Sequence, residues 1–237
     1  MMSDTWYYGG ARANDFSGIY CKMAMESYYH ASDFYKKIQH ANFCWDSWDE
    51  KKELDKCVIA TVVFSAMCLE AFFNDYIAAV LGDSSAHSIY DKLSPDGKFY
   101  LIVDFIFREQ VDRSQSCYGG VKTLFRLRND YVHNKSKEVK GCSYTAQEIS
   151  ELEEMLHDPQ NILEPPLLNK TEIGNDMRNA LEALKTIRNV AQYFDEHDSS
   201  CWAMIRLFGE YNFDLASLYE QEYMEEIFAK LGIKRRG

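Results

Sequence analysis

The sequence has few of the residues that interrupt helices: 4 prolines and 12 glycines among 237 residues. Runs that alternate apolar and polar residues, as half-buried strands do, are also scarce. Proline and glycine are the residues that helix interiors disfavour most, so their scarcity indicates long helices joined by short loops. Hydrophobic residues make up 46% of the chain, which is enough for a substantial core. We therefore predict an all-α protein.

The sequence also lacks the usual signs of a metal centre, a redox centre or a secreted protein. Its seven cysteines include no pair at C-x-x-C spacing. Their odd number and scattered positions favour reduced cysteines in an intracellular protein. Residues 1–6 contain no basic region followed by an apolar run, so they do not resemble a signal peptide. We expect no metal, no cofactor and a cytoplasmic location.

One apolar stretch, residues 57–81, raises the question of a membrane span. Glu70, Asn74 and Asp75 lie within it, and its charge-free part is shorter than the roughly 20 residues that cross a bilayer. We expect a buried central helix and no membrane partner.

Basic charge is scarce: 26 Lys and Arg stand against 37 Asp and Glu, a formal charge of −11. This balance argues against a protein that coats nucleic acid non-specifically, because such binding needs an excess of cations. Residues 122–140 are an exception, with six basic residues against two acidic ones, a local +4 that leaves −15 elsewhere.

Residues 148–164 carry six acidic residues and no Lys or Arg. They form either a solvated face or a lid that covers the basic segment.

Helical periodicity predicts four principal helices, at residues 16–45, 54–81, 118–134 and 171–197. Residues 46–52 are expected to form a charged connector, and Ser94-Pro95-Asp96-Gly97 predicts a turn. Gly119-Gly120 is expected to form a flexible entry to the third helix. Residues 202–231 are expected to form one or two packed helices. One face of the first helix, the face expected to be buried, carries Ile19, Met23, Ser27, His30 or Ala31, Phe34 and Ile38.

These elements predict an up-and-down helical bundle of four principal helices with additional short helices. We place them in a single domain over residues 1–237, with a core at about 15–197 and accessory helices at 198–237.

The segment Arg128-Asn129-Asp130-Tyr131-Val132-His133 stands near the end of the third predicted helix. A guanidinium can hold a phosphate through a planar fork of donors, and an imidazole can move protons near neutral pH. Asn129 and His133, four residues apart, lie one above the other on a helix, and Arg128 beside them has a side chain long enough to converge with them. Leu124, Leu127 and Tyr131 form a core stripe displaced from His133, so His133 is expected to face a cleft or an interface.

This segment resembles the hallmark of the HEPN superfamily of helical-bundle proteins: an arginine, a polar residue and a histidine a few residues later. The second helix adds to the likeness. Its Leu69-Glu70-Ala71-Phe72 is similar to a stretch of uncharacterised bacterial HEPN-like proteins. The resemblance covers roughly residues 15–197.

The resemblance implies a metal-independent endoribonuclease in which two such motifs approach across a homodimer. His133 would be the acid/base, Arg128 the phosphate clamp and Asn129 an orienting group. The basic residues Lys122, Arg126 and Lys135 would contact RNA. A toxin or defence system with a neutralising protein partner is also implied. Toxins paired with nucleotidyltransferase antitoxins have a tyrosine where this chain has Lys135, so control by modification of that tyrosine does not carry over.

Two alternatives stay open. Some members of the superfamily have lost catalysis and serve as non-catalytic modules for dimerisation and for protein or nucleotide binding. In a purely structural role, Arg128 would pair with Asp130 or Glu70, and His133 would cap the helix C-terminus, where a cation is favoured. Glu70 lies in an apolar run, where an unpaired carboxylate is costly, so we expect it to form a supporting salt bridge to Arg128.

Overall fold

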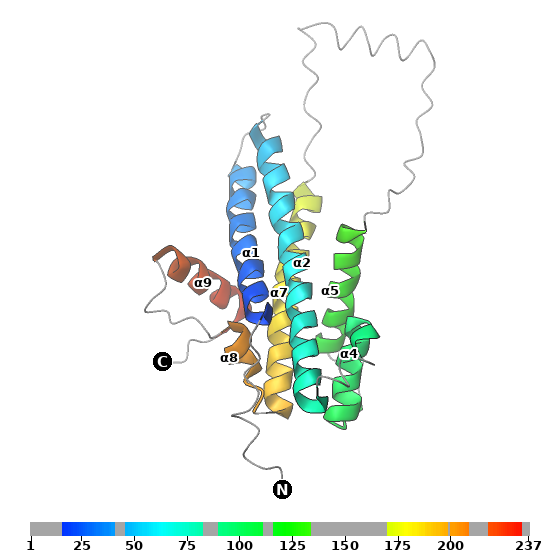
Figure 1. Ribbon diagram of the computed structural model, residues 1–237. Coiled ribbons are helices and arrows are strands. Elements are labelled where there is room, and N and C mark those ends of the chain that lie inside the picture. The colour runs from blue at the N-terminus through cyan, green and yellow to red at the C-terminus, as the bar shows by residue number, and fades with distance from the viewer. Residues whose placement is uncertain are drawn as a thin grey trace, which may run out of the picture.

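The computed structural model describes residues 16–40, 46–82, 90–110, 116–133, 170–198, 200–208 and 218–233, and every regular element within them is helical. The all-α prediction is confirmed. Four long helices lie side by side (Figure 1): α1 (Phe16–His40), α2 (Asp46–Leu81), α5 (Ser116–Val132) and α7 (Lys170–His197). The up-and-down order of the bundle and the domain limits stay predictions.

Five short elements complete the described fold. They are the 3-10 helix η2 (Tyr90–Lys92), α4 (Pro95–Leu101), the π-helix η3 (Ile102–Ile106), α8 (Ala203–Phe208) and α9 (Leu218–Leu231). The two C-terminal helices agree with the packed helices predicted for 202–231.

α2 packs against α1, α4, α5 and α7. At its C-terminal half, the fully buried ring of Phe194 from α7 lies 4.9 Å from Phe72 and 5.0 Å from Tyr76 between ring centroids. By length and composition Asp49–Leu81 could cross a membrane, but half of its most apolar window is buried inside the fold. Its contacts with four other helices are those of a core helix.

The predicted connector at 46–52 is wrong, because α2 already begins at Asp46. Its charged residues lie three or four apart and pair along the helix: Lys52 Nζ is 3.0 Å from Asp49 Oδ1, and Lys56 Nζ is 2.5 Å from Glu53 Oε1. Such pairs stabilise a helix, so the charges that indicated a loop support the first turns of α2. Its predicted end is confirmed at Gly82, whose φ of 84° is one that glycine adopts freely.

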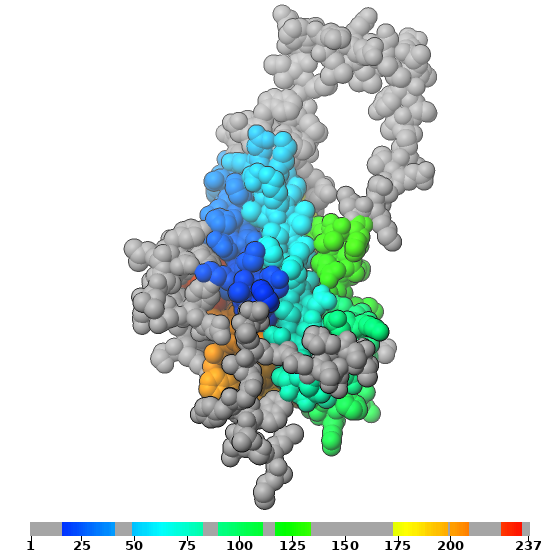
Figure 2. All heavy atoms as spheres, viewed as in Figure 1, coloured from blue at the N-terminus to red at the C-terminus, as the bar shows by residue number. Residues whose placement is uncertain are grey.

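The predicted buried face of α1 is wrong over its first half. Ile19 is 54% exposed and Met23 is 37% exposed. The face that meets the other helices instead begins with small residues, Ser17, Cys21 and Ala24. Small side chains let two helix axes approach closely, which explains why the buried face starts with them, ahead of Met25 and Tyr28. Figure 2 shows α1 (blue) and α2 (cyan) in contact along this side of the molecule.

The predicted turn at 94–97 is the start of α4. Ser94 is its N-cap, and the Ser94 hydroxyl accepts a hydrogen bond from the Gly97 amide at 3.3 Å. Pro95 takes the first helical position, where its missing N–H is not needed. Serine and proline therefore begin a helix here. The prediction failed because both residues are common in turns as well as at helix N-termini.

Gly120 lies inside α5, so the predicted flexible entry at Gly119-Gly120 is also wrong. A Cβ atom on Gly120 would come within 2.9 Å of the Thr186 hydroxyl oxygen on α7. A Cβ on Gly119 would meet nothing within 4 Å. Gly120 is thus the point at which α5 and α7 approach closely.

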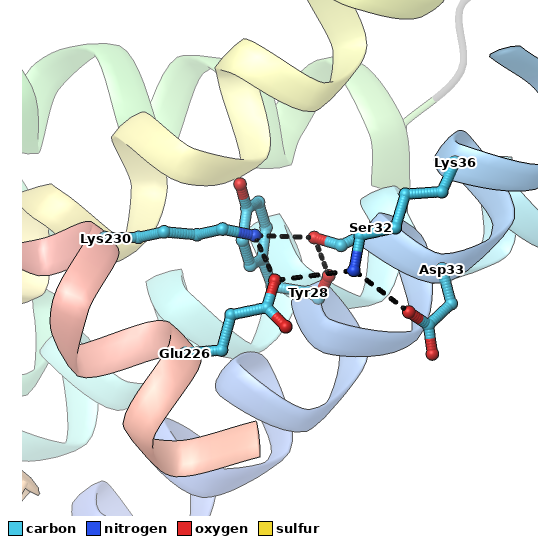
Figure 3. Close-up of polar contacts among 6 residues, drawn as sticks. All are labelled: Tyr28, Ser32, Asp33, Lys36, Glu226 and Lys230. Carbon is cyan, nitrogen blue, oxygen red and sulfur yellow. Dashed lines mark hydrogen bonds and ion pairs between the residues drawn. The ribbon is translucent and has the colours of Figure 1, made fainter. Parts of the chain in front are cut away.

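A polar cluster fastens α9 to α1 (Figure 3). The Lys230 ammonium lies over the Tyr28 ring at 5.0 Å, donates to the Ser32 hydroxyl at 3.3 Å and pairs with Glu226 at 2.7 Å. Lys36 of α1 reaches the same Glu226 carboxylate at 3.8 Å. The hydrogen bond from Lys230 is the main cause that lowers the pKa of Glu226 below its ordinary value.

Candidate functional site

One face of α5 is an exposed polar stripe made of Lys122, Arg126, Asn129 and His133. These residues are spaced by four, three and four positions, the spacing that brings side chains onto one side of a helix. All four are exposed. His133 stands just beyond the last residue of α5, and its amide still donates to the Asn129 carbonyl at 2.9 Å, so the stripe keeps helical geometry to its end.

Arg128 faces away from this stripe and binds Glu70 of α2. Its Nη2 donates to Glu70 Oε2 at 3.1 Å, and its Nη1 donates to Asn129 Oδ1 at 3.0 Å. The two side chains are 24% and 33% exposed, so the pair lies at the edge of the core. The expectation that Glu70 pairs with Arg128 is confirmed.

The guanidinium and the imidazole are not joined directly within one chain. Five residues correspond to about 140° around a helix, which turns Arg128 and His133 to different sides of α5. Among the residues that the structure describes, no hydrogen bond or ion pair links these two side chains. Asn129 connects them: its side chain accepts from Arg128, and its position places it on the same stripe as His133.

Lys98 is a member of this site that the sequence did not indicate. It lies on α4, its side chain is 2% exposed, and its ammonium is 4.0 Å from Glu70 Oε1. The two oxygens of the Glu70 carboxylate therefore face two different cations, from α4 and α5. In the sequence Lys98 follows a serine, a proline and a glycine, and nothing there distinguishes it from a surface lysine.

The side of α5 next to the stripe is acidic. Tyr131 is half-buried; burial raises its pKa, and the charges of Asp176, Asp55 and Asp130 raise it further. The tyrosine hydroxyl is therefore neutral near physiological pH. Within α5, positive charge is confined to Lys122, Arg126 and Arg128, so these side chains are where this helix could bind an anion such as phosphate.

A second polar cluster lies at the end of α7. His197 Nε2 is 2.9 Å from Glu109 Oε2, and its ring lies tilted against the Tyr193 ring with centroids 4.0 Å apart. His197 therefore packs against the Tyr193 and Phe107 rings. Across the described ranges, no three His, Cys, Asp or Glu side chains come close enough together to hold a metal ion. None of the five described cysteines forms a disulfide bond.

Lys135 and the acidic segment 148–164 lie outside the described residues, so the predicted RNA contact and the two interpretations of that segment stay predictions. Comparison with models of protein families, with curated proteins and with solved structures finds no match for this chain.

Proposed function

We propose that this protein is a metal-independent endoribonuclease of HEPN type. The observation that carries the proposal is the exposed stripe of Lys122, Arg126, Asn129 and His133, which Asn129 connects to Arg128. Two cations and an imidazole in one row suit a phosphodiester backbone, where cations bind phosphates and a histidine transfers protons.

In the proposed reaction His133 accepts the proton of a ribose 2′-hydroxyl as that oxygen attacks the adjacent phosphorus. Arg128 steadies the negative charge on the phosphate. The bond from phosphorus to the 5′-oxygen breaks, and the protonated His133 imidazole returns its proton to that oxygen. The products are a 2′,3′-cyclic phosphate and a free 5′-hydroxyl. A positioned acid/base group of this kind contributes roughly 10²–10⁴-fold to a rate.

The test uses the purified protein with single-stranded RNAs in the presence of EDTA. Wild type should cleave and leave a cyclic phosphate. The His133→Ala variant should lose cleavage while it keeps most of its RNA affinity, and Arg128→Ala should weaken both. His40→Ala is the matched control, because His40 is also an exposed histidine at the end of a long helix. Cleavage that survives His133→Ala, or RNA that wild type leaves intact, would contradict the catalytic proposal.

A second candidate function is a non-catalytic module for dimerisation and for protein or nucleotide binding. The pairing of Arg128 with Glu70 favours it, because an arginine held by a carboxylate is partly withdrawn from a ligand. The experiment above separates the two candidates: the module binds nucleotide or protein without cleaving RNA.

We further propose that the active form is a homodimer in which the α5 stripes of two copies approach, so that each phosphate meets residues from both chains. This arrangement would bring together an Arg128 and a His133 that one chain turns apart. Val132 lies beside His133 and is 52% exposed, so Val132→Glu should dissociate such a dimer in a sedimentation experiment. Ile19→Glu, which adds the same charge on α1, should not. If Ile19→Glu dissociates the dimer and Val132→Glu does not, the dimer interface lies on α1 and not on α5.

The family resemblance also suggests a toxin or defence system in which a partner protein neutralises the activity. The stripe is the surface that such a partner would cover, and its positive charge calls for an acidic partner surface.

A further inference from the structure

The Glu70 carboxylate lies between two cations of different kinds. Arg128 reaches Oε2 at hydrogen-bonding distance, 3.1 Å, and is 24% exposed. Lys98 faces Oε1 from 4.0 Å, which is longer than a hydrogen bond, and is 2% exposed. In this arrangement Arg128 holds the carboxylate, and the buried ammonium lies within reach of it.

The two cations differ in what they could do without Glu70. Glu70 is the one carboxylate within 4.0 Å of the Lys98 ammonium among the described residues. A buried ammonium without a counter-charge is strongly unfavourable, so Lys98 depends on Glu70. Arg128 lies at the surface, keeps a hydrogen bond to Asn129, and has three further N–H donors that bind no described group. It can therefore leave the carboxylate.

We propose that Lys98 is a positioning residue of this site: it takes over the Glu70 carboxylate when Arg128 turns to a phosphate. Without Lys98, departure of Arg128 would leave Glu70 without a cation at the edge of the core, and the carboxylate would hold the guanidinium back. With Lys98, a small rotation of the Glu70 side chain replaces the lost contact, and the buried charges remain paired throughout. The inference deepens the proposed function and rests on it for the identity of the anion.

Lys98 is well placed for this role because its helix is fixed. The Lys98 amide donates to the Ser94 carbonyl at 2.8 Å in the first turn of α4, and α4 packs against both α2 and α5. In Figure 1 α4 lies beside the lower part of α5. The ammonium is thus held near Glu70 by the packing of three helices, while the Arg128 side chain is accessible to solvent.

The first experiment measures Arg128 without RNA. In protein with labelled arginine, the exchange of the Arg128 guanidinium hydrogens with water is followed by NMR in wild type and in Lys98→Met, which removes the ammonium and keeps an apolar stem. We expect exchange to slow by about tenfold in the variant, because Glu70 then has Arg128 as its one cation and binds it more tightly. Lys56→Met, an exposed lysine of α2, should leave the exchange rate unchanged. Unchanged or faster exchange in Lys98→Met would overturn the inference.

The second experiment measures RNA affinity with a single-stranded 2′-O-methyl RNA, which lacks the attacking hydroxyl. Lys98→Met should weaken binding by about tenfold, the effect of one charge-assisted hydrogen bond. Adding Glu70→Gln should restore affinity to within about twofold, because the anion that retains Arg128 is then gone. A weakening that Glu70→Gln does not rescue would show a merely structural or direct RNA role for Lys98. Wild type that binds no RNA would refute the proposed function alone, since the exchange measurement still decides the role of Lys98.

Discussion

Replacing Glu70 by alanine should lower the free energy of unfolding by about 3 kcal/mol, at the lower end of what breaking a buried ion pair costs. Most of this loss comes from Lys98, whose side chain is 2% exposed and would have no carboxylate of the described residues within 4.0 Å of its ammonium. Arg128 contributes less, because it is a quarter exposed and water can solvate it once the carboxylate is gone. One-third exposure of Glu70 itself keeps the total at the lower end of the range.

Thermal unfolding followed by circular dichroism measures this loss. For a chain of this size 3 kcal/mol corresponds to a decrease in Tm of roughly 6–12 °C. The matched control is Glu53→Ala, the same substitution on the same helix, where the partner Lys56 is 69% exposed. Its Tm should fall by no more than about 3 °C, because exposed ion pairs contribute little. Arg128→Met should cost far less than Glu70→Ala. Equal losses in these two variants would show that the buried lysine does not depend on Glu70, and the reasoning about Lys98 would fail with it.

Two further predictions concern packing and pH. Gly120→Ala should destabilise the fold by about 1–3 kcal/mol, because its Cβ would collide with α7, whereas Gly119→Ala should stabilise it by about 0.5–1 kcal/mol in urea unfolding, since it only adds helix propensity. Equal changes in the free energy of unfolding for the two variants would show that Gly120 is not at a close contact of α5 with α7. Because the folded-state pKa of Glu226 is lowered, its pairing with Lys230 contributes stability above the ordinary glutamate pKa of about 4.3 and loses it as the pH falls further. In the Glu226→Gln variant, the free energy of unfolding should therefore fall less steeply as the pH is lowered below about 4.3. If it falls as steeply as in wild type, the ion pair of Glu226 with Lys230 does not stabilise the contact between α9 and α1.

The sequence predicted where the long helices lie, but it missed the first turns of α2 and the face that the first half of α1 buries. α7 was predicted at 171–197 and is found at Lys170–His197, because its apolar residues recur at helical intervals without a competing signal. On α1 the same rule failed. It ranked Ile19 and Met23 as core by hydrophobicity, whereas close helix packing selected Ser17, Cys21 and Ala24. Hydrophobic periodicity measures how apolar a face is, and it contains no term for how closely the neighbouring helix approaches.

The candidate site divides in the same way between what lies along one helix and what lies across helices. The stripe that ends at His133 follows from residue spacing alone, and the pairing of Glu70 could be predicted because an ionised carboxylate in an apolar helix needs a cation. The second cation beside Glu70 could not be predicted, because only the packing of α4 against α2 and α5 brings Lys98 to the carboxylate. The length of the arginine side chain suggested convergence with His133, but the Glu70 carboxylate, at the edge of the core, offers a charge-assisted hydrogen bond that a neutral imidazole does not. Arg128 therefore lies toward Glu70, and any ligand that uses it must compete with that carboxylate.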